Sequence, residues 1–397
     1  MASKTTPPSR TRKSPATLGC SAELYVYTHF SCLLEKNMVF SRLICKTRGA
    51  WGRSFHTSSL RAARVLCTDK IDEICVNIFE ERGHDVDYLP TMSEEELCEK
   101  VGQYDGMVVR SATKINEKVL KAASNLQVVG RAGVGVDNVD IEAATKAGVM
   151  VMNTPDGNTT STAQLAVSLL TNLVRKLPAG NSSVKRGEWD RKSYSNGIEL
   201  TGKTLGLIGC GRIGQDVAHM AQGMGLKVIA YDPVMSAADF EGVNITSADL
   251  ETVYAMSDFI SVHAPLTPQT DKLLNAETIQ KCKDGVLIVN CARGGIVDEA
   301  ALLEALNSGK VAGAALDVYT SEPPKEDLQE LLSHPKLICT PHLGASTEEA
   351  QLNVAREIAE QMCDAFDKKD YVGILNVNYM GASTVPQMKP FMRLAKT

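Results

Sequence analysis

The stretch TLGLIGCGRIGQDVAHMAQGMGLKVIAYDP, residues 204–233, decides the fold because it joins an apolar strand, a glycine-rich turn, a helix and a second apolar strand. Gly209, Gly211 and Gly214 separate the first strand from the helix. Glycines at these positions permit a tight turn, the close approach of a pyrophosphate and close packing of the helix on the strand. The free N–H groups of the first helical turn attract the same anion. We therefore predict a dinucleotide-binding unit, whose loop also includes Arg212 and Ile213.

Asp232 ends the second strand of this unit, eighteen residues after Gly214. A carboxylate at this position accepts a hydrogen bond from the 2′-hydroxyl of a ribose and repels a 2′-phosphate. The motif therefore predicts NAD rather than NADP as the cofactor.

Short runs of β-branched residues alternate with longer helical runs on both sides of this unit. Such alternation predicts parallel sheets whose faces are covered by helices. We expect an α/β protein with two doubly wound parallel-sheet domains, a Rossmann-type nucleotide-binding domain and a flavodoxin-like substrate domain, with a cleft between them. The expected strands span residues 64–68, 104–110, 126–132 and 149–155 in the first domain, and 204–209, 227–232, 258–265, 286–292, 313–318 and 337–342 in the second.

Two helices are expected to link the domains. One spans residues 159–177 and is followed by a loop rich in Gly, Ser, Asn and Lys. The other begins near Ser346, which has the capping-box spacing to Glu349, and would return to the first domain. The expected units are an N-terminal extension (1–62), a discontinuous substrate-binding domain (63–154 and 344–376), an NAD-binding domain (155–343) and a C-terminal tail (377–397).

Charge is distributed unevenly along the chain. Residues 1–64 contain 11 Lys and Arg and 2 acidic residues, whereas the remainder contains 31 and 45. No Asp or Glu occurs between Met38 and Arg64, a composition typical of a mitochondrial import sequence. A disordered tail or a misassigned start codon are the alternatives. We therefore expect a mitochondrial or cytoplasmic location.

Composition also excludes several kinds of partner. The acidic body argues against nucleic acid, whose phosphates require a clustered basic face. No stretch approaches the roughly 18 apolar residues of a membrane span. The eleven cysteines show neither a CxxC pair nor a metal-ligand spacing, so we expect reduced thiols and no metal site.

A second glycine-rich run, VVGRAGVGVDNVD at residues 128–140, is a natural control for the first. Gly133 and Gly135 again follow a strand, but Asn138 takes the place of the third glycine, and the next strand ends at the uncharged Asn153. This run is therefore not expected to bind the dinucleotide. Its backbone N–H groups are suited to a small anionic substrate instead.

A nicotinamide oxidoreductase that acts on a hydroxyl group needs a base and a cation for the substrate. Of the seven histidines, His263 and His342 follow strands of the second domain at the edge where open α/β sheets bind ligands. Arg293 and Glu322 follow the two strands before His342. Position alone does not decide which histidine is the base. Each of these four residues could also be an ordinary loop or turn residue without a catalytic role.

Five motifs between about residues 64 and 376, GRAGVGVDNVD, LIGCGRIG, NCARGGIVDE, GAALDV and PHLGASTEEAQ, resemble the D-isomer-specific 2-hydroxyacid dehydrogenases. The resemblance implies a catalytic trio in which Arg293 binds carboxylate, Glu322 holds the imidazole and His342 takes the hydroxyl proton. It adds His263, Pro265, Cys291, Ala292 and Asp317 to the cofactor contacts of Gly209, Gly211, Arg212, Ile213, Gly214 and Asp232. It implies substrate contacts at Arg110, Gly133, Val134 and Asn158, and phosphate contacts at Arg131 or at Arg191 and Lys192 of a neighbouring subunit.

The activity that the resemblance implies is NAD-dependent oxidation of 3-phospho-D-glycerate, a phosphorylated 2-hydroxy acid, to 3-phosphohydroxypyruvate, the first step of L-serine synthesis. The implied assembly is a homodimer or homotetramer joined through the NAD-binding domains. One alternative is glyoxylate/hydroxypyruvate reductase, which needs no phosphate site. An alternative of another class is a NAD-sensing, corepressor-like binding protein.

The chain departs from the family in a few places. Gln164 and Val134 stand where glutamate and threonine are common. Longer members continue into regulatory domains that bind serine, whereas this chain ends at Thr397, so feedback inhibition through such a domain is not expected.

Overall fold

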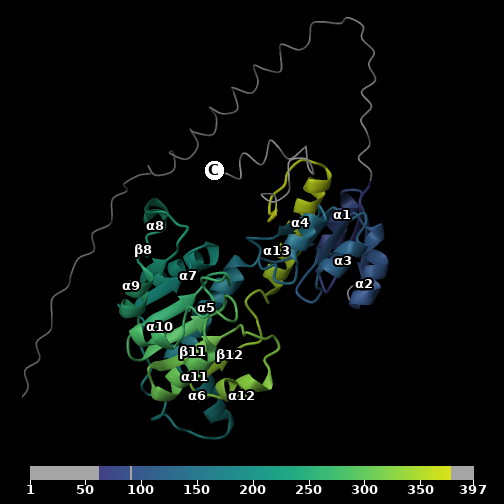
Figure 1. The fold of residues 1–397 in the computed structure, drawn as a ribbon. Coiled ribbons are helices and arrows are strands. Elements are labelled where there is room, and N and C mark those ends of the chain that lie inside the picture. Colours follow the sequence, from purple (N-terminus) through teal and green to yellow (C-terminus); the bar gives the residue numbers. More distant parts are fainter. Residues whose placement is uncertain (1–61, 90–91, 377–397) are drawn as a thin grey trace, which may run out of the picture. The chain divides into compact units, whose positions relative to one another are not determined.

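A computed structural model describes residues 62–89 and 92–376 (Figure 1). Residues 1–61, which hold the expected import sequence, and the expected tail at 377–397 lie outside the described residues. Within the described part, no helix combines the length and apolar character needed to cross a bilayer.

The first sheet contains five parallel strands in the order β2-β1-β3-β4-β5, the flavodoxin-like arrangement. Four were expected from the sequence. The fifth, β2, was missed because it is an edge strand whose sequence, DVDYL, alternates acids with apolar residues and has no fully buried residue. The strands are β1 (Arg64–Thr68), β2 (Asp85–Leu89), β3 (Gly106–Val109), β4 (Val128–Arg131) and β5 (Met150–Asn153).

Helices cover both faces of this sheet. Helices α1 and α13 pack on one face, where Phe79, Ile358 and Met362 are buried. Helices α2, α3 and α4 cover the other face, where Leu97 and Val119 are buried. The elements are α1 (Ile74–Glu81), α2 (Glu94–Lys100), the short 3-10 helix η1 (Val101–Gln103), α3 (Glu117–Ala122), α4 (Ile141–Lys146) and α13 (Glu348–Phe366).

Helix α13 begins later than the sequence indicated. The predicted capping box between Ser346 and Glu349 is wrong, because Ser346 still belongs to the preceding turn, where its N–H donates to the carbonyl of Leu343 (2.8 Å). Thr347 caps the helix instead, and its hydroxyl accepts from the N–H of Ala350 (3.2 Å).

The second sheet contains seven parallel strands in the order β12-β11-β10-β9-β6-β7-β8, a Rossmann-type arrangement. Six were expected. The seventh, β8, is a two-residue edge strand, too short to leave a periodic pattern. The strands are β6 (Thr204–Ile208), β7 (Lys227–Tyr231), β8 (Thr246–Ser247), β9 (Phe259–Val262), β10 (Val286–Asn290), β11 (Val311–Leu316) and β12 (Leu337–Cys339).

Helices α5 and α7 pack on one face of the second sheet, and α9, α10, α11 and α12 pack on the other. The elements are α5 (Thr159–Arg175), α6 (Leu177–Lys185), α7 (Arg212–Gly223), α8 (Ala237–Gly242), α9 (Leu250–Met256), α10 (Ala276–Lys281), α11 (Glu299–Ser308), the 3-10 helix η2 (Glu326–Leu328) and α12 (Gln329–Leu332). Together with the first sheet, this arrangement confirms the predicted fold class of two doubly wound parallel sheets.

The connector differs from the expected single helix and loop. Helix α5 ends because Lys176 adopts a left-handed conformation (φ 52°). A second helix, α6, follows at once, with Pro178 in its first turn, a position where proline is preorganised for a helix. The predicted loop after residue 177 is therefore wrong at residues 178–185, which are helical.

Close packing of α13 on the first sheet depends on a glycine in β4. A Cβ added at Gly130 would overlap the sulfur of Met362 and lie 2.7 Å from Cγ1 of Ile358. The side chains of Met362 and Ile358 thus pack directly on the strand backbone. Residues at opposite ends of the described chain in this way share one apolar core.

We expect Gly130→Ala to lower the free energy of unfolding by about 1–3 kcal/mol, because the added methyl group overpacks this contact. Urea denaturation checks this value. The control is Gly223→Ala at the end of α7, where a Cβ would meet open space and should not lower stability. Equal stability of the two variants would contradict the direct packing of α13 on β4.

Candidate active site

Arg293, Glu322 and His342 follow β10, β11 and β12, which are neighbours in the second sheet. The carboxyl ends of parallel strands lie at one edge of a sheet, where ligands of open α/β folds bind. The strand order therefore places the three predicted catalytic residues along the same edge.

His342 and Glu322 are joined by a short hydrogen bond. Nδ1 of His342 donates to Oε2 of Glu322 (2.6 Å), and Oε1 of Glu322 accepts from the N–H of Tyr319 (3.1 Å). The carboxylate is thereby anchored to the backbone. This contact occupies Nδ1, so the half-exposed ring can present Nε2 to a substrate.

The turn that carries His342 is held by Asp317, directly after β11. Its buried carboxylate accepts from the hydroxyl of Thr340 (2.6 Å) and from the N–H groups of Leu343 (2.7 Å) and Gly344 (2.9 Å). His342 has a φ of 53°, which non-glycine residues rarely adopt. Asp317, expected to contact the cofactor, is thus engaged in holding the turn in this structure.

Arg293 lies in the loop after β10. Its Nη1 donates to the carbonyl of Ala292 (2.6 Å), and its Nε donates to Oδ2 of Asp137 (3.0 Å) in the first sheet's loop after β4. The carbonyl of Arg293 accepts from the side-chain amide of Asn290 (2.8 Å). The guanidinium is therefore held from both sheets.

The glycine loop after β6 has the geometry of a pyrophosphate site. Gly209 has a φ of 92°, and a Cβ there would lie 2.6 Å from the carbonyl of His263. A Cβ at Gly214 would lie 2.5 Å from the carbonyl oxygen of Gly209, so α7 packs closely behind the turn. A Cβ at Gly211 would meet open space at the first turn of α7. These residues fit an anionic ligand that approaches the backbone.

Asp232 ties the glycine loop to the end of β7. Its Oδ2 accepts from the N–H of Cys210 (2.8 Å), and its Oδ1 accepts from the N–H of Val234 (2.9 Å). The carboxylate is half-buried beside the loop, the position expected for a ribose contact.

His263 differs from His342 in its surroundings. Its Nε2 hydrogen-bonds with the hydroxyl of Ser261 (2.8 Å), and burial lowers its pKa to about 4. The ring is therefore neutral at pH 7, and the backbone carbonyl and Cβ of His263 lie against Gly209 and Gly214 of the glycine loop. His342, in contrast, has a carboxylate partner, so the geometry favours His342 as the base.

The other predicted cofactor contacts lie near these loops with different exposures. Cys291 is buried directly after β10, and burial raises the pKa of its thiol. Ala292 and Ile213 are half-buried, and Pro265 is exposed. Arg212 is exposed and forms an ion pair with Asp156 (2.6 Å).

Three arginines lie near one another at the predicted substrate site. Burial, followed by the nearby Arg293 and Arg110, lowers the pKa of Arg131 to about 10. The Nε atoms of Arg110 and Arg131 are buried without a hydrogen-bond partner among the described residues. Mutual repulsion and unpaired donors make this cluster suited to a multiply charged anion.

Among the described residues, the remaining predicted substrate residues form no hydrogen bond or ion pair with the trio. The carbonyls of Gly133 and Val134 accept from Thr154 and Asn153. Asn158 lies at the start of α5, and its Oδ1 is buried without a partner in the described part of the chain. Arg191 and Lys192 are exposed in the loop after α6. Within the described ranges, no hydrogen bond or ion pair joins Asn158, Arg191 or Lys192 to the trio.

Sequence reasoning missed Asp137 and Asn290. Asn290 is buried at the end of β10, where its Oδ1 accepts from the N–H of Ala292 (3.0 Å) and its amide donates to Arg293. A polar residue that ends an otherwise apolar strand is a signal that could have indicated it. Asp137 had no such signal, because its partner lies 156 residues away.

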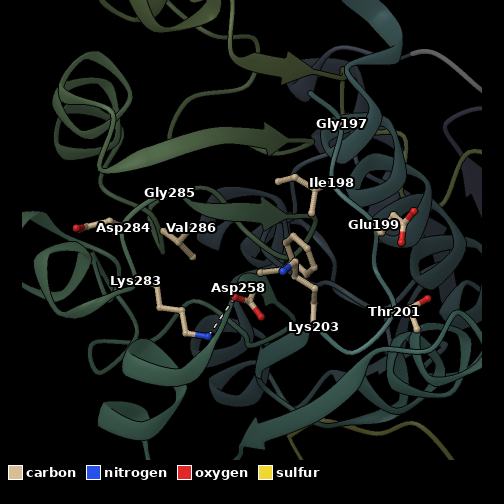
Figure 2. A pocket seen from close by; sticks show the side chains of 11 residues that line it. Gly197, Ile198, Glu199, Thr201, Lys203, Asp258, Lys283, Asp284, Gly285 and Val286 are labelled. Atoms are coloured by element: carbon tan, nitrogen blue, oxygen red, sulfur yellow. Dashed lines mark hydrogen bonds and ion pairs between the residues drawn. The ribbon is translucent and has the colours of Figure 1, made fainter. Parts of the chain in front are cut away.

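A cavity of about 560 Å³ lies at the opposite edge of the second sheet, at the amino ends of β6, β9 and β10 (Figure 2). Figure 2 shows Lys283 and Asp258 joined across it, with Nζ 3.1 Å from Oδ1. It is remote from the strand ends that carry the trio. Among the described residues, no group of three or more His, Cys, Asp or Glu could hold a metal.

Fold and glycine loop define a dinucleotide-binding α/β protein of the dehydrogenase class. Residues 167–344 match the family model described as D-isomer specific 2-hydroxyacid dehydrogenase, NAD binding domain. A D-3-phosphoglycerate dehydrogenase from Rattus norvegicus is 47% identical over 333 residues, which cover 84% of this chain and 62% of the relative. The corresponding protein from Archaeoglobus fulgidus is 46% identical over 333 residues, covering 84% of this chain and 63% of the relative.

Solved structures show the same likeness. The TT0316 protein from Thermus thermophilus has a TM-score of 0.72 and 32% identity, covering 79% of this chain and 99% of that one. A glyoxylate reductase from Paecilomyes thermophila has a TM-score of 0.73 and 29% identity, with coverage of 79% and 98%. The chain belongs to the D-isomer-specific 2-hydroxyacid dehydrogenase family. It spans about 62% of the length of the curated relatives it matches.

We expect Asp317→Asn to lower the free energy of unfolding of the cofactor-free protein by about 1–3 kcal/mol. An amide that replaces the carboxylate turns one acceptor into a donor facing backbone N–H groups. Urea denaturation measures the loss, and Asp271→Asn at an exposed position in the loop after β9 is the control for a carboxylate-to-amide change. Unchanged stability of Asp317→Asn would contradict its role in holding the turn.

Proposed function

We propose that the protein oxidises 3-phospho-D-glycerate to 3-phosphohydroxypyruvate with NAD, a reversible step that begins L-serine synthesis. The observation that carries the proposal is the 2.6 Å hydrogen bond between His342 and Glu322, at the sheet edge that also carries Arg293. The names of the curated relatives support the choice of substrate.

The trio can divide the reaction between its three members. His342 takes the hydroxyl proton at Nε2, and Glu322 stabilises the imidazolium that forms. Arg293 binds the substrate carboxylate and polarises the oxygen at the reacting carbon. NAD, when bound, supplies the acceptor for the hydride that leaves this carbon.

The glycine loop and Asp232 would hold the cofactor, with His263, Pro265, Cys291 and Ala292 near the nicotinamide end. This assignment rests on the open space at Gly211 and on the backbone contacts of Asp232. The proposed NAD-binding domain spans residues 155–343, and the proposed substrate domain spans 63–154 and 344–376. Packing of α13 on the first sheet supports the second boundary.

Arg131 and Arg110 are the proposed contacts for the substrate phosphate. The substrate carries anionic groups at both ends, and the cluster with Arg293 supplies three cations for them. Backbone groups of Gly133 and Val134, and Asn158, would bind the remaining oxygens. Arg191 and Lys192 of a neighbouring subunit remain further candidates for the phosphate.

Glyoxylate/hydroxypyruvate reductase is a second candidate, favoured by the fold likeness to the solved glyoxylate reductase. It would use the same trio, but it needs no phosphate contact. Comparison of 3-phospho-D-glycerate with D-glycerate separates the two activities. Equal kcat/KM values for both substrates would favour the reductase.

We expect His342→Ala to lower kcat with 3-phospho-D-glycerate by roughly 10²–10⁴-fold, because the base for the hydroxyl proton is lost. NADH formation, followed by its absorbance, measures the rate. The dissociation constant for NADH should stay unchanged, which serves as the control. A variant that keeps its wild-type rate would refute the proposed role of His342.

A second copy of the chain is the proposed protein partner, bound through the NAD-binding domain. Helix α6 and the loop after it expose three large apolar side chains, Leu177 (52%), Val184 (57%) and Trp189 (83%). Trp189 is the type of residue that dominates binding energy at interfaces. This surface supports a homodimer, or a homotetramer that contains such dimers.

We expect Trp189→Ala to weaken the dimer by about tenfold or more, since truncation of a hot-spot aromatic residue costs about 2 kcal/mol or more and each ~1.4 kcal/mol is a factor of ten. Analytical ultracentrifugation over a concentration series measures the change. Met256→Ala, which truncates an exposed apolar side chain at the end of α9, should have no effect. A wild-type monomer at micromolar concentration would rule out the proposed assembly.

A further inference from the structure

The ion pair between Asp137 and Arg293 joins the two loops that the proposed function assigns to the substrate. Asp137 follows the glycine run after β4, and Arg293 follows β10. Nε of Arg293 lies 3.0 Å from Oδ2 of Asp137. Asp137 belongs to neither the predicted trio nor the predicted substrate contacts.

This pair and one backbone contact orient the guanidinium. Nε donates to Asp137, and Nη1 donates to the carbonyl of Ala292 (2.6 Å). The guanidinium is planar, so two contacts at different nitrogens define its plane. Nη2 then lies against the backbone of Gly135, where an added Cβ would overlap it. Neither of these two contacts uses the protons of Nη2. Nη2 therefore points at the glycine run after β4, the loop that would receive the substrate carboxylate.

Electrostatics gives a reason for an acid at this position. Arg293 and Arg110 both lie close enough to Arg131 to repel its guanidinium, whereas Asp137 and Asp69 attract it. Moving a long cationic side chain from such a cluster into solvent lowers its electrostatic free energy, unless a counter-charge holds the side chain in place. The Arg293 side chain stays 29% exposed, whereas that of Asp137 is 73% exposed. Exposed ion pairs add little to the stability of the fold, so the main effect of this pair is to orient the guanidinium of Arg293.

The geometry points to Asp137 as the positioning residue for Arg293, aiming its guanidinium at the substrate carboxylate; this inference rests on the proposed function. Asp137 does not contact the substrate in this role. A purely electrostatic role makes the opposite prediction, because removal of a negative charge beside three arginines would strengthen the binding of an anion.

The test measures the binding of 3-phospho-D-glycerate to the NADH-saturated protein, a combination that cannot react, by isothermal titration calorimetry. Asp137→Asn keeps the shape of the side chain and removes its charge. We expect its dissociation constant for 3-phospho-D-glycerate to rise roughly tenfold, the effect of losing one charge-assisted hydrogen bond. Asp137→Ala should weaken binding at least as much.

Two readouts separate positioning from a general structural effect. The dissociation constant for NADH should change less than about twofold, because no contact of the glycine loop is altered. Steady-state kinetics should show the increase mainly in KM, with a smaller fall in kcat. Glu142→Gln is the matched control: it removes one negative charge from an exposed carboxylate of α4 that pairs with Lys146 (2.7 Å), and all constants should match the wild type.

Unchanged or tighter binding of 3-phospho-D-glycerate by Asp137→Asn would overturn the positioning role. If the wild type turns over this substrate while Asp137→Asn behaves normally, the inference fails and the proposed function stands. If the wild type binds the substrate without turnover and Asp137→Asn binds it more weakly, the proposed function fails and the positioning role stands. If the wild type neither binds nor oxidises it, both fail.

Discussion

The buried carboxylate of Asp317 is the interaction on which the candidate site depends. It lies at the end of β11, and its three hydrogen bonds fix the turn after β12. Because β11 also leads to Glu322, one group controls the relative positions of the acid and the imidazole. The 2.6 Å contact between His342 and Glu322 follows from this arrangement. The edge of the sheet thus brings together a histidine and a glutamate from two separate loops.

Close packing against a glycine is a second constraint that recurs in both sheets. At Gly214, helix α7 approaches the glycine turn, and at Gly130, helix α13 approaches β4. Each contact leaves no room for a Cβ at the glycine. The first builds the anion-binding turn, and the second fastens the last described helix to the first sheet. The absence of a Cβ in glycine is therefore needed both for the nucleotide loop and for the packing of the first domain.

The charges of the site are distributed over both sheets. Arg110 and Arg131 come from the first sheet, whereas Arg293 comes from the second. Arg110 and Arg293 both repel the guanidinium of Arg131. Asp137 offsets part of this repulsion and restricts where Arg293 can point. The proposed anionic substrate would add further negative charge beside these three cations.

The sequence by itself determined the parts that depend on local sterics and periodicity. The run from Gly209 to Asp232 specified the nucleotide loop, and the alternation of strands and helices specified two parallel sheets. The positions of Arg293, Glu322 and His342 after successive strands were readable for the same reason. Edge strands β2 and β8, helix α6 and the start of α13 were missed, because short or polar elements carry weak periodic signals.

Only the tertiary structure decided which of these residues meet. Strand order brought β10, β11 and β12 side by side, and this placed Glu322 against His342 rather than leaving His263 as an equal candidate. The pair of Asp137 and Arg293 spans 156 positions and has no local signature at all. Contacts of this kind depend on how whole sheets and their loops pack. They join residues far apart in the chain, so no short stretch of sequence indicates them.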